Sequence, residues 1–221
     1  MRLLRASVLT AVVAASAGCG GGDSTGERPV QPLGTGGLGR ALDLARDGGR
    51  QPMRFRATIT RPGRGTRPSY DADGHLDLRR RAGDATLRIA DAEDVGLPAQ
   101  MALKWTARTV TVAGQARSRS DARASGGLLG ALPDVLHALA EIVADADAVR
   151  ERAAGSWLFE VPPTAAIRSG IPPQAPARGR WKGEAQAAPN GRLRRVVLQV
   201  PAPALGATVR AGTSSLELEL G

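Results

Sequence analysis

Apolar and polar residues alternate one by one over much of the chain, which is the pattern of a β-strand with one buried face. The segment 53–60 is the clearest case, because apolar residues fill its odd positions and arginine or threonine its even ones. The same alternation predicts further strands over 76–78, 85–89, 101–105, 110–112, 157–161, 181–187, 193–200, 207–211 and 216–220.

The period becomes helical in two places. Residues 38–46 form a short amphipathic segment that is followed by a Gly-Gly pair, a helix stop signal. A longer apolar stripe runs from Leu128 to Val149 and predicts a second helix, with Pro133 in its first turn and Gly155 as its stop.

Turn residues divide these elements. The Asp-Gly pair at 73–74 and the Asn-Gly pair at 190–191 are hairpin signals, and a turn is expected at 106–109. The segment 114–127 is rich in serine, arginine and glycine and is predicted to be a loop. The segment 162–179 holds five prolines and is predicted to be irregular.

Together these elements predict an α+β fold built on one curved antiparallel sheet. Short connections favour antiparallel neighbours, and one face of the sheet is apolar while the other is wet. A sheet of about 9–11 strands has to curl or close, so we expect a half-barrel whose concave face is covered by the helices.

The first residues form an export signal. Arg2 and Arg5 precede an apolar run at 6–15, which is far shorter than the ~20 residues that span a bilayer. The tetrapeptide SAGC at 16–19 is similar to the bacterial lipobox, in which the cysteine is diacylated and the signal is cut before it. Two acyl chains on Cys19 make a durable membrane anchor.

Ordinary secretion is the alternative, because Ala15-Ser16-Ala17 also fits a signal-peptidase site. The predicted organisation is a lipoprotein signal peptide at 1–18, a flexible tether at 19–34 and a single domain at 35–221. The chain is then exported and held on the extracytoplasmic face of the cell membrane. Cys19 is the sole cysteine, so no disulfide forms within the chain.

The composition is basic, with a formal net charge of +9. Of its 30 lysines and arginines, only Lys104 and Lys182 are lysine. The arginines are scattered, and no aromatic residues interleave with them as bases would require, so we do not expect nucleic acid as a partner. A basic surface is instead attracted to anionic lipid headgroups.

The sequence contains few residues arranged for catalysis or metal binding. On the second helix His137 lies three residues after Asp134 and four before Glu141, a spacing more typical of a solvated helix face than of a metal or acid–base site. The other histidine, His75, follows the expected hairpin. No cofactor or metal is predicted, and no nucleophile, phosphate or dinucleotide motif appears, so we do not expect an enzyme.

Two acidic groups are interpreted structurally. Asp71 and Asp73 resemble the start of a calcium loop, but the spacing and the closing glutamate of that motif are missing, and a turn explains them better. The cluster of Asp91, Glu93 and Asp94 is interpreted as a surface loop.

Three short motifs, taken with the lipobox, resemble the actinobacterial LppX/LprG-type lipoproteins. They are the strand RTVTVAG at 108–114, the strand GSWLFEV at 155–161 and the hairpin PNGRLRRVVL at 189–198. The resemblance implies a LolA/LolB-like half-barrel. It also implies that the apolar concave face binds acyl chains of lipid or glycolipid and carries them in the cell envelope, with an envelope transport protein as a possible partner. The proline-rich segment and the end of the chain directly after the last strand depart from that family.

Two functions remain open. In the first, an apolar concavity holds lipid, and its predicted lining is Phe55, Leu87, Met101, Leu103, Trp105, Leu136, Leu139, Phe159 and Trp181. Small residues on the same faces, among them Ala57 and Gly183, leave room for a ligand or for close packing. In the second, the core is filled and the chain is a non-catalytic surface or scaffolding lipoprotein that binds a protein partner.

Overall fold

The computed structural model describes residues 36–61, 65–90, 92, 98–124, 128–162, 180–202 and 212–221. Their helices and strands belong to one compact unit, Pro32–Gly221. The predicted signal peptide, the tether with Cys19, the acidic cluster at 91–94 (apart from Ala92) and the predicted strand at 207–211 lie outside the described residues. So does most of the proline-rich segment.

The first half of the unit is a helix followed by six strands: α1 (Gly36–Asp47), β1 (Arg50–Arg61), β2 (Gly65–Asp77), β3 (Ala82–Ile89), β4 (Gln100–Trp105), β5 (Thr109–Val112) and β6 (Gln115–Ser118). The second half is three short helices followed by five strands: α2 (Arg119–Ala124), α3 (Leu128–Glu141), the 3₁₀ helix η2 (Ile142–Asp145), β7 (Ala148–Ala153), β8 (Ser156–Val161), β9 (Trp181–Ala187), β10 (Leu193–Ala202) and β11 (Gly212–Leu220).

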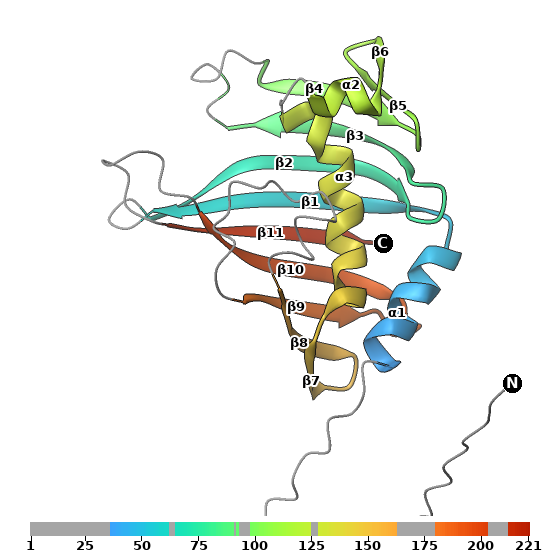
Figure 1. The fold of residues 1–221 in the computed structure, drawn as a ribbon, viewed down its shortest axis with the longest axis vertical. Coiled ribbons are helices and arrows are strands. Elements are labelled where there is room, and N and C mark those ends of the chain that lie inside the picture. Colours follow the sequence, from blue (N-terminus) through green and yellow to red (C-terminus); the bar gives the residue numbers. More distant parts are fainter. Residues whose placement is uncertain are drawn as a thin grey trace, which may run out of the picture. The chain divides into compact units, whose positions relative to one another are not determined.

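The eleven strands form one antiparallel sheet in the order β6-β5-β4-β3-β2-β1-β11-β10-β9-β8-β7. The first and last strands therefore pair at its centre, where Phe55 lies opposite Leu218. The sheet is open, since β6 and β7 form its two edges. The segment α2–α3–η2 joins those edges, so α3 crosses one face of the sheet (Figure 1). The predicted α+β class and antiparallel sheet are confirmed.

One face of the sheet is apolar and packs beneath α1 and α3, and we call it the inner face. In β4 the alternation is complete: Met101, Leu103 and Trp105 are buried and the residues between them are exposed. The helix α1 contributes its apolar side to the same core through Leu38 and Leu42. None of the described helices is long and apolar enough to cross a membrane.

The second predicted helix ends earlier than its apolar stripe indicates. The helix α3 ends at Glu141, η2 follows, and Val149 belongs to strand β7. Pro133 lies inside α3 rather than in its first turn. Gly155, at φ +72°, forms the β7–β8 turn. The prediction failed because apolar residues of the 3₁₀ turn and of the following strand continue the helical spacing.

Three turn and loop predictions also need correction. Gly74 lies within β2, opposite both Met53 and Ala85, so the Asp-Gly pair forms no hairpin, and His75 is a strand residue. A side chain at Gly74 would place its Cβ 2.0 Å from the backbone oxygen of Asp84, so close strand packing explains this glycine. The predicted loop at 114–127 contains β6 and α2. The turns at 106–109 and 190–191 are confirmed.

Candidate functional site

All nine residues predicted to line an apolar concavity belong to one buried cluster on the inner face, and none is more than 6% exposed. Seven come from strands β1, β3, β4, β8 and β9. Leu136 and Leu139 come from α3. The structure therefore brings the predicted residues together. Burial alone does not distinguish a packed core from a ligand site.

Aromatic rings fill the space beside two inner-face glycines. Phe159 lies opposite Gly183, and a Cβ at Gly183 would lie 2.2 Å from the ring carbon Cζ of Phe159. Trp105 lies opposite Gly83 in the same way, with its Cζ2 2.4 Å from such a Cβ. At these two places the small residues accommodate close packing rather than empty space.

A continuous row of inner-face residues crosses the sheet from β3 to β8, and we call it the central row. Each member lies opposite the next in the strand register: Ile89, Tyr70, Ala57, Leu216, Leu198, Gly183 and Phe159. Leu198 and Phe159 are fully or almost fully buried, whereas Tyr70 and Leu216 are only half-buried. These two side chains flank the small side chain of Ala57 in the central strand β1.

The positions of the helices explain why some inner-face residues are less buried than others. Figure 1 shows α1 and α3 over the part of the sheet where β1 starts and β11 ends, and no described helix lies over the part toward the end of β1. Inner-face residues such as Leu76 and Leu218 are fully buried, while Ala57, Ile89 and Val200 retain 7–8% exposure. The apolar face thus continues past the described helices to a less covered region around Ala57.

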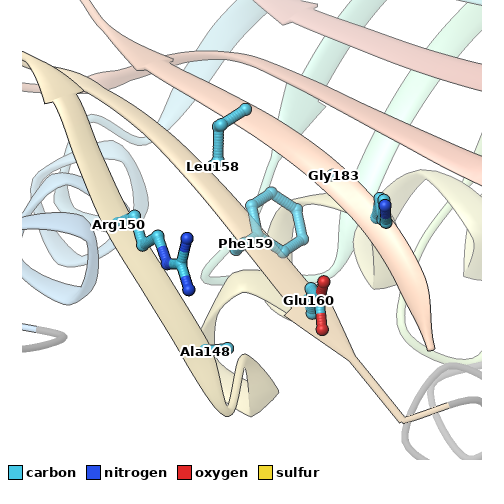
Figure 2. A pocket seen from close by; sticks show the side chains of 7 residues that line it. Ala148, Arg150, Leu158, Phe159, Glu160 and Gly183 are labelled. Atoms are coloured by element: carbon cyan, nitrogen blue, oxygen red, sulfur yellow. The ribbon is translucent and has the colours of Figure 1, made fainter.

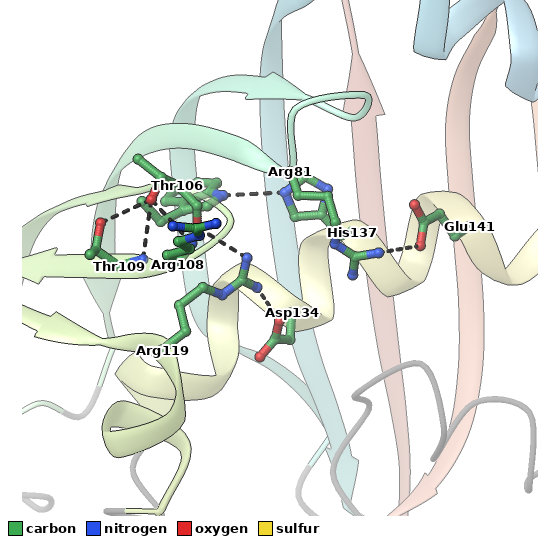
Figure 3. Close-up of polar contacts among 9 residues, drawn as sticks. Arg81, Thr106, Arg108, Thr109, Arg119, Asp134, His137 and Glu141 are labelled. Carbon is green, nitrogen blue, oxygen red and sulfur yellow. Dashed lines mark hydrogen bonds and ion pairs between the residues drawn. The ribbon is translucent and has the colours of Figure 1, made fainter.

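A polar cluster joins α3 to the neighbouring strands (Figure 3). The indole Nε1–H of Trp105 donates a hydrogen bond to Nε2 of His137 over 3.3 Å, and His137 is fully buried. Since Nε2 accepts, the proton of a neutral imidazole resides on Nδ1. That atom is buried and has no hydrogen-bond partner among the described residues.

Asp134 and Glu141 also differ from the prediction of a solvated helix face. Asp134 is buried and forms an ion pair with buried Arg119, which also donates to the backbone oxygen of Thr106 over 3.2 Å. Glu141 is half-buried and pairs with Arg81 at 3.2 Å. The prediction of a solvated flank is therefore wrong for Asp134 and His137, because α3 is covered by β4, α2 and the β2–β3 turn as well as by the sheet.

Burial, together with the positive charges of Arg81 and Arg119, lowers the pKa of His137 from 6.5 to about 3. The imidazole is thus neutral at physiological pH and acts as a hydrogen-bond acceptor for Trp105. A group that releases its proton so readily is poorly suited to acid–base work near pH 7. Among the described residues, no group of histidines and carboxylates could hold a metal ion.

The outer face carries pairs of opposite charge between neighbouring strands. Asp71 accepts a hydrogen bond from Arg56 at 2.9 Å, an interaction that raises the pKa of the arginine. Asp73 pairs with Arg54 and Arg88 in the same manner. These partners account for both aspartates, as strand residues rather than as the predicted turn.

A depression of about 250 Å³ lies over β7, β8 and β9 (Figure 2). Leu158 lines it and is 38% exposed, an unusual value for a large apolar residue in this protein. Arg150, Glu160 and Lys182 surround it with charge of both signs. This depression was not indicated by the sequence, because Leu158 falls on the wet side of a strand that alternates regularly.

Comparison with solved structures finds three similar chains. The lipoprotein LppX of Mycobacterium tuberculosis is 12% identical over 85% of this chain and 92% of its own, with a TM-score of 0.43. LprF of Mycobacterium bovis is 13% identical over 85% and 90%, with a TM-score of 0.45. A LolA superfamily protein of Nitrosomonas europaea is 11% identical over 84% and 92%, with a TM-score of 0.39.

The fold therefore resembles that of LppX and of the LolA superfamily, as the sequence motifs indicated. Neither a scan against protein-family models nor a search of curated proteins finds a match. The likeness concerns the fold alone, and function has to be inferred from this chain's own residues.

Proposed function

We propose that this chain is an exported lipoprotein, anchored through Cys19, whose inner face accepts an acyl chain of a lipid or glycolipid and carries or presents it in the cell envelope. The observation that supports this proposal is the central row. Apolar side chains continue across the sheet beyond the cover of α1 and α3, and their burial decreases around Ala57. An acyl chain there would remove the remaining apolar surface from water.

The proposed entry point is the site of Ala57, between the half-buried side chains of Tyr70 and Leu216. A methyl side chain leaves the most room at the centre of the row. The tyrosine offers an apolar ring to the chain and a hydroxyl to a polar headgroup. Transfer would then consist of desolvation and release, with no covalent chemistry and no cofactor.

The first experiment is native mass spectrometry of Pro32–Gly221, the compact unit, purified from a bacterium and then extracted with organic solvent. We expect adducts that release phospholipid or glycolipid. Ala57→Trp should fill the entry and remove most of the adduct. The matched control is Ala102→Trp, since Ala102 is exposed on the opposite face of β4. An unloaded wild-type mass that stays unchanged after incubation with lipid vesicles would contradict lipid carriage.

The anchor needs a test of its own. The full chain should be expressed in a bacterium that acylates lipoproteins and labelled with an alkyne-bearing fatty acid. We expect label on the wild type and none on Cys19→Ser. Labelling of neither, with the mature N-terminus at residue 18, would favour ordinary secretion after Ala17.

A scaffolding lipoprotein that binds a protein partner is the second candidate. The rings of Phe159 and Trp105, which fill the space beside the inner-face glycines, favour it, because a tightly packed core leaves no room for a ligand. In that case neither the wild type nor the two tryptophan variants would carry a lipid adduct. A partner would then bind an exposed surface such as the depression around Leu158.

A further inference from the structure

A second concave surface lies at the end of the sheet where α1 packs. It is a groove of about 730 Å³ between α1, the β7–β8 turn and the β9–β10 turn, and we call it the α1 groove. Arg40 and Leu44 of α1, Trp157 of β8 and Arg194 of β10 contribute to its lining. None of these residues belongs to the central row or to the predicted concavity.

The two cations of this groove have no partner among the described residues. Arg40 and Arg194 are both exposed, and within the described residues neither side chain forms an ion pair or a hydrogen bond. Some other arginines of the sheet are paired, as Arg195 is with Glu217 at 2.5 Å and Arg50 with Asp84 at the same distance, whereas Arg108 and Arg117 have no ion pair among the described residues. The groove thus presents two guanidinium groups that are free to bind an anion.

Acidic groups near the groove are already engaged. Glu151 accepts a hydrogen bond from the backbone N–H of Gly155, a residue that lines the groove. Asp43 on α1 pairs with Arg46 at 3.2 Å. The described residues that line the groove include Arg40 and Arg194 and no carboxylate, so the charge of the lining is positive.

The apolar part of the groove suits a membrane interface. The Trp157 indole is 7% exposed, and the start of α1 packs on it, since a Cβ at Gly37 would lie 3.5 Å from the ring. Leu44 is half-buried beside the β9–β10 turn. Tryptophan and arginine together are the residues that favour the headgroup region of a bilayer.

The position of the groove along the chain also favours a membrane interface. The helix α1 is the first described element after the predicted tether, and Gly37, in its first turn, lines the groove. A chain of 17 residues from Cys19 to Gly36 reaches at most ~60 Å when fully extended. If Cys19 is acylated, α1 is the described element that follows the anchor first along the chain.

We propose that the α1 groove binds the phosphate of an anionic phospholipid in the membrane that holds the chain, and so orients the domain on that membrane. The proposal rests on the proposed anchor but not on lipid carriage by the inner face. Arg40 and Arg194 would contact the phosphate, while the half-buried Leu44 would face the glycerol and the upper acyl region above the buried Trp157 ring.

The test is flotation of Pro32–Gly221 with vesicles, so that binding does not depend on an acylated Cys19. We expect binding to vesicles of phosphatidylglycerol and phosphatidylethanolamine, little binding to pure phosphatidylcholine, and a decrease with added salt. Each of Arg40→Ala and Arg194→Ala should weaken partitioning about fivefold, as expected for one basic residue near an anionic surface.

The matched controls are Arg108→Ala and Arg117→Ala, which remove exposed arginines whose side chains are likewise unpaired, near β5 and β6. An equal loss in the controls would show attraction by net charge alone and overturn the proposal. Equal binding to phosphatidylcholine would overturn it as well. Saturable binding of inorganic phosphate that Arg40→Ala abolishes, without vesicle binding, would identify a soluble anion instead of a membrane.

The two proposals fail separately. Ala57→Trp should leave vesicle binding unchanged while it removes the carried lipid, because Ala57 lies on the inner face at the centre of the sheet. Conversely, Arg40→Ala with Arg194→Ala should leave the extracted lipid unchanged.

Discussion

The indole N–H of Trp105 and the Nε2 atom of His137 form a hydrogen bond of 3.3 Å inside the core, where it joins β4 to the middle of α3. This bond requires an imidazole that accepts, and therefore one that is not protonated at Nε2. Protonation of His137 would break the bond and leave a positive charge buried near Arg81 and Arg119. The packing of α3 on the sheet is thus linked to the charge state of one residue.

The stability of the fold should fall as the pH drops below neutrality because of His137. Its pKa is about 3 in the folded protein and 6.5 for an unperturbed histidine, so between these values the unfolded state binds the additional proton. At pH 5 this proton uptake lowers the free energy of unfolding by about 2 kcal/mol. Urea unfolding at pH 7 and pH 5 should show that His137→Gln, whose amide oxygen can accept from Trp105, loses about 2 kcal/mol less than the wild type.

Ile142→Val is the control for this measurement. It removes one buried methylene near the same helix and should lower the free energy of unfolding by about 1 kcal/mol at both pH values. Parallel pH slopes for the wild type and His137→Gln would mean that the imidazole is accessible to protons in the folded state.

Gly183→Ala should destabilise the fold, because its Cβ would lie 2.2 Å from the Phe159 ring. Overpacking of this kind lowers the free energy of unfolding by about 1–3 kcal/mol. Adding Phe159→Leu should restore part of that loss, which a double-mutant cycle in urea would measure. Gly39→Ala is the contrasting change: nothing lies within 4 Å of its Cβ, and it should stabilise α1 by about 0.5–1 kcal/mol. Additive effects at positions 159 and 183 would contradict the contact.

The strands could be predicted from the sequence because burial on one face leaves a period of two, as in Met101, Leu103 and Trp105. The role of Gly74 could not be predicted, since an Asp-Gly pair occurs both in tight turns and at close contacts between strands. Only the strand register distinguishes the two. The short elements β6 and α2 carry too few apolar residues for either period to show.

The candidate site was predicted in part for the same reason. The apolar residues of the inner face follow from periodicity, but the burial of Asp134 and His137 does not. A helix covered on several sides shows polar residues at helical spacing whether they face water or partners such as Arg119 and Trp105. The α1 groove joins residues far apart in the chain, so no local pattern marks it.

Arg119→Met should destabilise the fold because it would remove a buried counter-charge from the buried carboxylate of Asp134. Removing one partner of a buried ion pair costs about 3–5 kcal/mol, whereas replacing both partners by apolar residues is often neutral. Arg119→Met with Asp134→Leu should therefore recover much of the loss in chemical denaturation. Arg50→Met is the exposed counterpart and should change stability by less than about 1 kcal/mol. A loss as small for Arg119→Met would show that Asp134 is solvated.

The edge strand β7 should depend on its charges to remain unpaired. Its sequence, AVRERA, places Arg150 and Arg152 on an edge that has exposed residues and, within the described part of the chain, no further strand beside it. Charged side chains on an edge oppose pairing with a second chain. Arg150→Val with Arg152→Val should therefore promote association, seen as a rise in mass by light scattering with concentration. The control is Lys104→Val with Lys182→Val, which makes the same chemical change on exposed positions of interior strands β4 and β9. Because the backbone of an interior strand is already paired on both sides, the control should stay monomeric under conditions where the β7 variant associates. Equal association of both variants would attribute the effect to added apolar surface rather than to the edge.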